Sequence, residues 1–442
     1  ARLAVGVDEW NSHPAVTPEM MGRSAGKVET IEAMLARLGG PFAPEHAGAC
    51  SRAAPEASVL AQPVVPERLR FVGSPSFDPR PYLDSTSREH YVKPIQTAKE
   101  LPEDVRVPHV SVRCGRAASL RLLSLLDRGQ RLALVPSSQV RRKLRSGIFT
   151  VPKDQARDRM VMDSRPANLA EDGGDRWIGS LGTLSQFHHL FVGPDQAVDI
   201  FAEDLREFYH AFLVGHERQI RNALAMEYRP SELAHLASFR DELSSEEWIT
   251  PCLSTLAMGD CRAVGFGQTS HLSVILRHSE LTLNQFVTLT GRPPRQGLAA
   301  GLLIDDFVLL DRVARGDAPG SGEAKRLMEQ VHRAYEIAGL PRHDAKSVSG
   351  VRRAEFWGGL VDGDQGSVRP NPKRTIPLAS LLLKTVQGGV ASSKLLEILS
   401  GGLVSAFQLR RRLLCLLSSV YVEQQGPRAP NASFRAPRAL LA

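Results

Sequence analysis

The sequence has few cysteines and lacks several common motifs. Its five cysteines lie far apart, and no pair has the Cys-x-x-Cys spacing that is typical of structural zinc sites. No apolar run reaches the roughly 18 residues that a membrane-spanning helix needs. The first residues, ARLAVGVDEWNSHP, lack the basic segment and apolar core of a secretory signal. An odd cysteine count without such a signal favours a reducing intracellular compartment, either cytoplasm or nucleus.

The composition is ordinary for a globular protein. The chain has 442 residues, 42% of them hydrophobic and 23% charged, which leaves room for two or more domains. A net charge of +7 and a pI of about 9.3 suit a polyanionic partner such as nucleic acid, although many unrelated proteins share these values. The first residue is not Met, which indicates a piece of a longer product.

Hydrophobic patterning predicts an α+β fold, with helices packed on one face of an antiparallel sheet. Strands are expected at 132–135, 148–151 and 197–202, with a further strand in DRMVMDSRPAN and a β-hairpin at 301–311. Helices are expected at 29–38, 118–126, 231–243, 263–276 and 323–338, and in EDLREFYHAFLVG directly after 202. The C-terminal third is leucine-rich and predicted to be helical to about Tyr421.

Two adjacent acids interrupt the apolar stretch GLLIDDFVLLD. If the flanking apolar residues pair as strands, Asp305 and Asp306 lie at the hairpin tip, within reach of water and metal. Two close carboxylates repel each other, and one takes up a proton unless a cation lies between them. Magnesium prefers such oxygens and often keeps a substrate phosphate as a further ligand. The pair therefore indicates a divalent-metal site, against the plainer alternative of a solvated turn.

A two-metal phosphoryl-transfer site needs carboxylates from more than one strand. The strand expected at 197–202 runs into EDLREFYHAF, which offers Asp204, with Asp199 and Glu203 as rivals. Asp204 is favoured because the planar aromatic Tyr209 follows it by five residues. We therefore expect this third acid to lie beside the hairpin tip.

These motifs resemble those of reverse transcriptases. EDLREFYHAF resembles the first catalytic motif of that family, and LLIDDFVLL resembles its paired Asp at a hairpin tip. FTVPKDQARDRMVMDSRPANL resembles the fingers hairpin, LAMGDCRAVGFGQ the motif between the two catalytic ones, AGLPRHDAKSV a later lysine motif, and AEFWGGLVDGDQGSVRP the primer grip. The set covers roughly 142–421, and its order carries the resemblance because each motif alone is weak.

The resemblance implies a role for each matched residue. Asp204, Asp305 and Asp306 would be the catalytic acids and would hold two Mg²⁺ ions, for which Mn²⁺ can substitute. Tyr209 would lie beneath the sugar and select deoxynucleotides. The implied nucleotide-binding residues are Lys153, Arg159, Tyr209, Gly259, Gln268 and Lys346. The implied template–primer residues are Arg165, Asn168, Phe356, Trp357 and Gly358.

Some of these residues also have structural alternatives. Asp163, Arg165 and Asn168 fit a network that holds the fingers as well as they fit substrate contact. Gly259 fits an ordinary turn, and Gln268 fits a surface amide. The basic runs RRKLR at 141–145 and RRR at 410–412 fit a template track or a solvated helix face, and the first also fits a nuclear-import patch. Four histidines are interpreted as core or surface residues rather than metal ligands: His210, His271, His278 and His343.

The sequence also departs from the family pattern. Ala257 stands where relatives usually have proline, and Ile304 precedes the Asp pair where many have a small or polar residue. About fifty residues separate the first catalytic motif from the Gly259 motif, which implies an inserted helical pair. No ribonuclease H-like set of acids follows Tyr421.

The resemblance implies a right-hand polymerase and a retroelement's RNA-directed DNA polymerase activity. Its expected partners are an RNA or DNA template with a primer, and dNTPs; no membrane is expected, and protein partners are left open. The alternatives are a non-catalytic nucleic-acid-binding relative, an RNA-dependent RNA polymerase, which the bulky Tyr209 disfavours, and a non-enzymatic helical scaffold. The expected parts are a partly disordered N-terminal extension (1–118), fingers (119–190), an antiparallel palm sheet packed by helices (191–350), a primer grip with a helical thumb-like region (351–422) and a disordered tail (423–442).

Overall fold

The structure is a computed structural model that describes residues 61–171, 176–418, 420–421 and 433–435. It mixes helices with antiparallel sheets, as the α+β prediction requires. The chain divides into two compact units, one at Val59–Arg352 and a smaller one whose described residues begin at Arg353. The helix expected at 29–38 lies outside the described residues. Among the described helices, none combines the length and apolarity needed to span a membrane.

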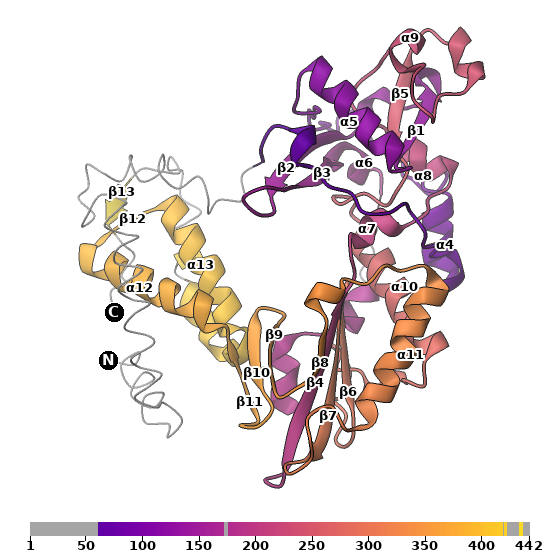
Figure 1. Ribbon diagram of the computed structural model, residues 1–442. Helices are drawn as coiled ribbons and strands as arrows, with labels where there is room; N and C mark the ends of the chain where they lie inside the picture. The colour runs from indigo at the N-terminus through magenta and orange to yellow at the C-terminus, as the bar shows by residue number, and fades with distance from the viewer. Residues whose placement is uncertain (1–60, 172–175, 419, 422–432, 436–442) are drawn as a thin grey trace. The chain divides into compact units, whose positions relative to one another are not determined.

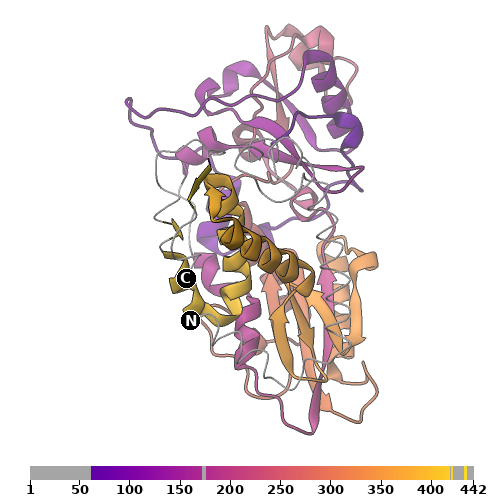
Figure 2. The same cartoon turned by 90° about the vertical axis from the view of Figure 1, so that its left-hand side faces the viewer.

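The larger unit is built on a four-stranded sheet with the order β6-β7-β4-β8, in which all neighbours are antiparallel. Its strands are β4 (Gln196–Asp204), β6 (Ala299–Leu303), β7 (Asp306–Ala314) and β8 (Val348–Val351). Figure 2 shows strands of this sheet running side by side. The predicted hairpin at 301–311 is confirmed: β6 and β7 pair with a two-residue turn between Leu303 and Asp306.

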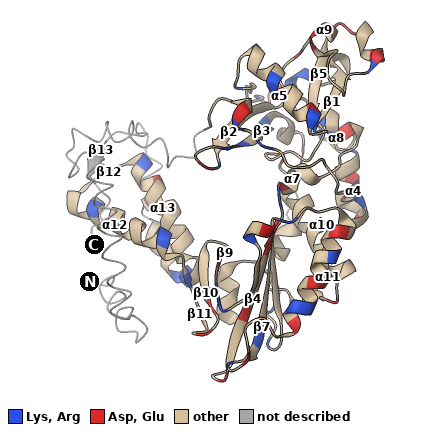
Figure 3. Ribbon diagram, viewed as in Figure 1, with Lys and Arg blue, Asp and Glu red and all other residues tan. Residues whose placement is uncertain are grey.

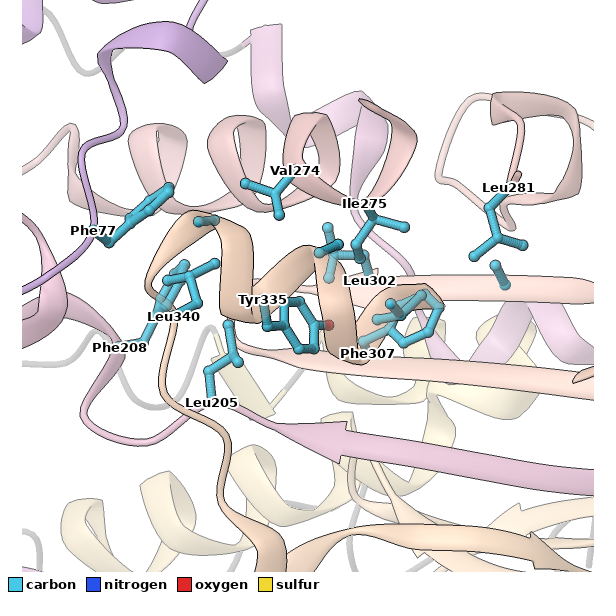
Figure 4. Close-up of a cluster of buried hydrophobic side chains, with 14 of the residues drawn as sticks. Phe77, Leu205, Phe208, Val274, Ile275, Leu281, Leu302, Phe307, Tyr335 and Leu340 are labelled. Atoms are coloured by element: carbon cyan, nitrogen blue, oxygen red, sulfur yellow. The ribbon is translucent and has the colours of Figure 1, made fainter. Parts of the chain in front are cut away.

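Helices α10 (Ala263–His278) and α11 (Glu323–Ala338) cover the sheet (Figure 1). Leu327 and Val331 of α11 share the core with Val274 and Ile275 of α10 and with Phe307 of β7. Figure 4 shows several of these side chains between the helices and the strands. The α11 prediction matches both ends of the helix, because the four-residue apolar spacing fixes its buried face and Gly339, at φ +75°, caps it in the left-handed conformation.

A second core in the same unit packs around two antiparallel strand pairs. One pair is β1 (Leu132–Pro136) with β5 (Ile249–Leu253), and the other is the hairpin of β2 (Gly147–Pro152) and β3 (Asp158–Asp163). Helix α5 (Arg116–Arg128) buries Leu122, Leu123 and Leu126 against them. Among the described residues, the other α-helices of this unit are α4 (Ser85–Val92), α6 (Arg165–Leu169), α7 (Phe208–Ala211), α8 (His216–Arg221) and α9 (Pro230–Leu233).

The structure differs from the expected N-terminal extension. Residues 61–118 belong to the larger unit and supply buried side chains to both of its cores. Phe77 and Tyr91 pack in the core under the four-stranded sheet, and Val64 and Leu69 pack in the second core. Burial of these aromatic and aliphatic side chains stabilises the larger unit, so residues 61–118 are part of its fold.

The smaller unit combines a three-stranded sheet with helices. Its strands are β9 (Arg353–Phe356), β10 (Gly359–Asp362) and β11 (Ser367–Pro370), and its helices are α12 (Pro372–Gly388) and α13 (Ser393–Phe407). A 3₁₀ segment follows at Gln408–Leu417. β12 (Val390–Ser392) pairs with β13 (Ser433–Arg435), so the part of the chain expected to be a disordered tail contains a strand.

Two helix predictions in the larger unit are wrong for identifiable reasons. The helix expected directly after 202 is interrupted: β4 continues to Asp204, Glu207 adopts a left-handed φ of +48°, and only the one-turn α7 follows. The helix expected at 231–243 ends at Leu233. Beyond it, the Asp127 carboxylate accepts the N–H groups of Ala237 (2.7 Å) and Ser238 (2.9 Å), and these long-range bonds replace helical ones.

Candidate active site

Three acids gather at one end of the four-stranded sheet. β4 ends at Asp204, and β7 begins at Asp306, which lies directly opposite in the antiparallel register. Asp305 lies in the turn between β6 and β7, and its carbonyl oxygen accepts a hydrogen bond of 3.1 Å from the N–H of Leu205. The sheet register therefore brings together acids from two distant parts of the sequence. Figure 3 marks both acidic and basic positions at this end of the sheet.

The surroundings of the three acids favour a shared proton. Burial, the charge of Asp305 and a hydrogen bond with Asp204 raise the pKa of Asp306 to about 7. Burial and the charge of Asp204 also raise the pKa of Asp305. Near neutral pH the protein alone therefore does not stabilise three full negative charges here. Oxygen donors whose mutual repulsion a cation would relieve are a fitting ligand set for a hard divalent ion.

Two basic side chains approach the same acids. Lys346, in the 3₁₀ segment Asp344–Lys346, places its Nζ 2.8 Å from Oδ2 of Asp204 while remaining 58% exposed. Arg159 projects from β3 into solvent, and its charge is among the causes that lower the pKa of Asp305. Lys153 is exposed in the loop between β2 and β3, where its N–H donates to the carbonyl of Arg157. The strand pair β2–β3 thus contributes positive charge to the acidic end of the sheet.

Tyr209 also lies close to the acids. It is half-buried on α7 and packs against the core of the sheet, with its ring 5.8 Å from that of Phe208. Burial and then the charge of Asp305 raise its pKa. Because its pKa responds to the charge of Asp305 and its side chain is partly exposed, Tyr209 is placed to contact a ligand bound at the acids.

Gly259 has a backbone reason for being glycine. Its φ is +119°, and a Cβ added there would collide with the carbonyl oxygen of Met162 in β3. The neighbouring backbone is tied to β3 by a hydrogen bond of 2.9 Å from the N–H of Met162 to the carbonyl of Met258. Gly259 therefore permits a close approach between two segments of the protein itself.

Gln268 requires a correction, because the structure buries it completely beneath the hairpin turn. Its Oε1 accepts the N–H of Ile304 (2.7 Å), and its Nε2 donates to the carbonyls of Ser180 and Leu302 (3.3 Å each). Every polar atom of this side chain thus bonds to backbone, which overturns the surface-amide alternative and leaves no polar atom of the side chain unbonded for a nucleotide. Gln268 instead holds the turn that carries the acids.

Asn168 also acts within the protein. Its Nδ2 donates to the carbonyl of Gly259 (2.9 Å), and its Oδ1 accepts from the Arg221 Nη2 (2.7 Å) and the Cys261 N–H (3.1 Å). These contacts favour the structural alternative over template contact, because no polar atom of the side chain is left over. The amide joins α6 to the segment after β5.

The other predicted template–primer residues lie in two places. Arg165 is exposed and makes a two-pronged pair with Asp163, at 2.7 Å for each bond. Phe356, Trp357 and Gly358 belong to the smaller unit, in the tight turn between β9 and β10. Trp357 (φ +49°) and Gly358 (φ +78°) form the two central positions of that turn, a pattern typical of type I′ hairpins.

Sequence reasoning named Glu203 only as a rival to Asp204 and missed its role in holding the end of β4. Glu203 is 3% exposed, and its Oε1 is bonded to the Nε2 of His332 on α11 (2.6 Å) and to the Oγ of Ser347 (2.7 Å). Because Ser347 follows Lys346 directly, Glu203 fixes the segment that delivers this lysine to Asp204. The sequence shows Glu203 as an acid inside an apolar strand, but it does not reveal the partners of Glu203, which are more than a hundred residues away.

A second acidic group lies among arginines. Within the described part of the chain, Glu171, Asp260 and Cys261 bring one ligand atom each within 4.8 Å of one another. Arg218 pairs with Asp260 at 2.6 Å, and Arg221 pairs with Glu171 at 2.5 Å. Burial raises the pKa of the Cys261 thiol to about 11. Arginines already neutralise these acids and the thiol is protonated, so the group is an internal ion-pair network rather than a metal site.

Comparisons with known proteins give distant likenesses. No protein-family model and no curated protein matches the sequence. Among solved structures, a foamy viral protease-reverse transcriptase in complex with RNA/DNA hybrid matches with a TM-score of 0.46 and 13% identity, over 93% of this chain and 45% of that chain. A complex of a foamy viral protease-reverse transcriptase with double-stranded DNA matches with a TM-score of 0.45 and 14% identity, over 75% of this chain and 47% of that chain. The chain thus spans about half the length of these proteins.

Proposed function

We propose that this chain is an RNA-directed DNA polymerase of a retroelement, which adds dNTPs to a primer 3′-hydroxyl along a nucleic-acid template. The observation that carries the proposal is the register pair of Asp204 and Asp306, with Asp305 in the adjoining turn. Carboxylates from two adjacent strands and a hairpin tip suit a site that binds two divalent ions for nucleotidyl transfer. The α+β architecture then corresponds to a palm, with β2–β3 as part of the fingers and α12–α13 as a thumb-like region.

Asp204, Asp305 and Asp306 would hold two Mg²⁺ ions, and Mn²⁺ suits the same oxygen donors. When bound, the ions supply a lowered pKa for the primer hydroxyl and charge neutralisation for the leaving pyrophosphate. The raised pKa of Asp306 supports this fit, since the site is costly to ionise without a cation. The protein's own contribution is positioning, because the three acids are fixed by a sheet register and a tight turn.

The residues around the acids support binding of a deoxynucleoside triphosphate. Arg159 and Lys153 would bind its phosphates, since a guanidinium binds phosphate with two bonds and an ammonium acts as a point charge. Lys346, already at Asp204, would balance charge at the same place. Tyr209 would contact the sugar from its partly exposed position beside Asp305 and exclude a 2′-hydroxyl. The proposal assigns no nucleotide contact to Gln268.

Template and primer would be held by residues outside the group of acids. Arg165, exposed on α6, offers a guanidinium to a backbone phosphate, and Phe356, Trp357 and Gly358 would contact the primer. Part of that affinity would be electrostatic and would fall as salt rises, because phosphate contacts release counterions.

Primer extension tests the proposal. Purified protein, a primed RNA template and Mg²⁺ are combined with either dNTPs or NTPs, and Asp305→Asn is compared with the wild type. We expect dNTP extension that falls by at least about 100-fold in Asp305→Asn, because the substitution removes a carboxylate at the point where charge develops. The matched control is Asp317→Asn, an exposed acid beyond the far end of β7, which should extend normally.

Other results would favour the alternatives. A preference for NTPs would identify an RNA-dependent RNA polymerase. Tight template binding without extension would identify a non-catalytic relative. Extension that Asp305→Asn leaves unchanged would remove the assigned acids from the mechanism.

A further inference from the structure

Two buried side chains, His271 and Tyr335, are hydrogen-bonded to each other, and His271 also bonds the backbone of the hairpin turn; we call this pair the relay. His271 of α10 is completely buried, with Nδ1 2.7 Å from the carbonyl oxygen of Ile304 and Nε2 2.9 Å from the hydroxyl of Tyr335. A carbonyl oxygen only accepts hydrogen bonds, so Nδ1 carries the proton, and Nε2 accepts from the Tyr335 O–H. Tyr335 belongs to α11 and is also completely buried. The relay therefore connects both helices to one peptide group of the turn.

That peptide group belongs to a strained residue. Ile304 has a φ of +60° at the first position of the two-residue turn, where glycine is preferred. A β-branched side chain in this region costs on the order of 1–2 kcal/mol, so neighbouring contacts must hold it there. Asp305 and Asp306 follow immediately, and their direction depends on the dihedral angles of Ile304.

We propose that His271 and Tyr335 are positioning residues that hold the Ile304 peptide in its left-handed conformation, so that Asp305 and Asp306 face Asp204. Gln268 bonds the N–H of Ile304, whereas His271 bonds its carbonyl, so the residue is held on both sides. Relaxation of the turn toward negative φ would rotate the acids away from Asp204 without removing any of them. The inference rests on the proposed function, since it assumes that these acids bind divalent cations.

The test measures Mn²⁺ affinity of the full chain without nucleic acid, from the electron paramagnetic resonance signal of free Mn²⁺. We expect His271→Leu to bind Mn²⁺ about tenfold more weakly, as is typical when a residue behind the ligands is lost. Tyr335→Phe removes one oxygen atom only and should weaken binding by a smaller factor. The matched control is Ser270→Ala, because Ser270 is also fully buried on α10 but bonds its own helix at Phe266.

Two further variants separate positioning from general stability. His271→Asn keeps an N–H near the position of Nδ1 and should retain Mn²⁺ binding within about threefold of the wild type. Ile304→Gly accepts φ +60° without strain, so adding His271→Leu to it should weaken binding much less than in the wild type. In extension assays, His271→Leu should lower kcat about tenfold and change KM for dNTP less than twofold.

Three outcomes would overturn the inference. Wild-type Mn²⁺ affinity in a folded His271→Leu or Tyr335→Phe variant would show that the relay only stabilises the core. An equal loss in the Ile304→Gly background would show that the relay does not act through Ile304. Failure of the wild type itself to bind Mn²⁺ would instead reject the proposed function, and with it the premise of the relay.

Discussion

At the scale of single residues, the site is defined by a carboxylate that resists ionisation. Asp306 has a pKa of about 7 because it is buried and faces both Asp305 and Asp204. A raised carboxyl pKa is a common outcome when several acids share a small, partly buried volume. Lys346 offsets part of this repulsion, since its charge lowers the pKa of Asp306. The protonation of Asp306 therefore depends on how many positive charges lie beside the three acids.

This raised pKa predicts a pH dependence of stability in the absence of divalent ions. Between the usual Asp pKa of 3.8 and about 7, the folded state holds a proton that the unfolded state releases. Stability from this group is therefore present at low pH and lost as pH rises toward 7. The side chain of Asp306→Asn cannot ionise, so the variant does not lose this stability as pH rises. The Tm of the variant minus the Tm of the wild type should therefore be about 2–4 °C larger at pH 8 than at pH 5.

Thermal unfolding in EDTA at several pH values measures this difference, and Asp317→Asn serves as the exposed control. Saturating Mg²⁺ should reduce the Tm advantage of the variant at pH 8. The ion binds the ionised carboxylate and so stabilises the wild type, whereas the Asn side chain carries no charge to bind it. A Tm difference between variant and wild type that is the same at pH 5 and pH 8 would contradict the raised pKa of Asp306.

At the scale of elements, local sequence predicted what local interactions determine. The hairpin at 301–311 and the helix at 323–338 have strong periodic patterns and clear ends, so their positions followed from the sequence. The region at 231–243 has a weaker pattern, and Asp127, more than a hundred residues away, captures its N–H groups. Periodicity cannot reveal such partners.

The candidate site shows the same division. Asp204, Asp305 and Asp306 were predictable because each stands where an apolar run ends. The burial of Gln268 was not predicted, because its partner is the backbone of Ile304, which only the folded sheet brings near. His271 was interpreted as a core or surface histidine, and its bond to the same backbone is likewise visible only in the fold.

The junction between β3 and the segment after β5 gives a prediction at this scale. Gly259→Ala should destabilise the protein by about 2–3 kcal/mol, because the added Cβ meets the carbonyl oxygen of Met162 at a φ of +119°. Denaturant unfolding measures the change. Gly316→Ala is the control, since a Cβ there meets nothing within 4 Å and its φ is not in the left-handed region. Unchanged stability with weaker extension would assign Gly259 to substrate contact instead.

At the scale of the whole molecule, residues before 118 pack against the same core as the four-stranded sheet. Tyr91 packs edge-on against Phe266 of α10, and its carbonyl accepts from the buried Arg218 (3.0 Å). Arg218 in turn pairs with Asp260, which directly follows Gly259. Residues before 118 therefore reach the site through packed aromatics and a buried ion pair, rather than forming a separate appendage.

Phe77 tests this view of the larger unit. It is fully buried, and its ring lies 4.8 Å from that of Phe212, which directly follows the helix that carries Tyr209. Phe77→Ala should lower the free energy of unfolding by about 3–5 kcal/mol, since a large cavity opens in a core shared with the sheet. Phe191→Ala, at a position that is 71% exposed, is the control and should change it by less than about 0.5 kcal/mol. If the two variants unfold alike in denaturant titrations, the segment at 61–118 contributes little to the fold of the larger unit, and the expected extension would be the better description.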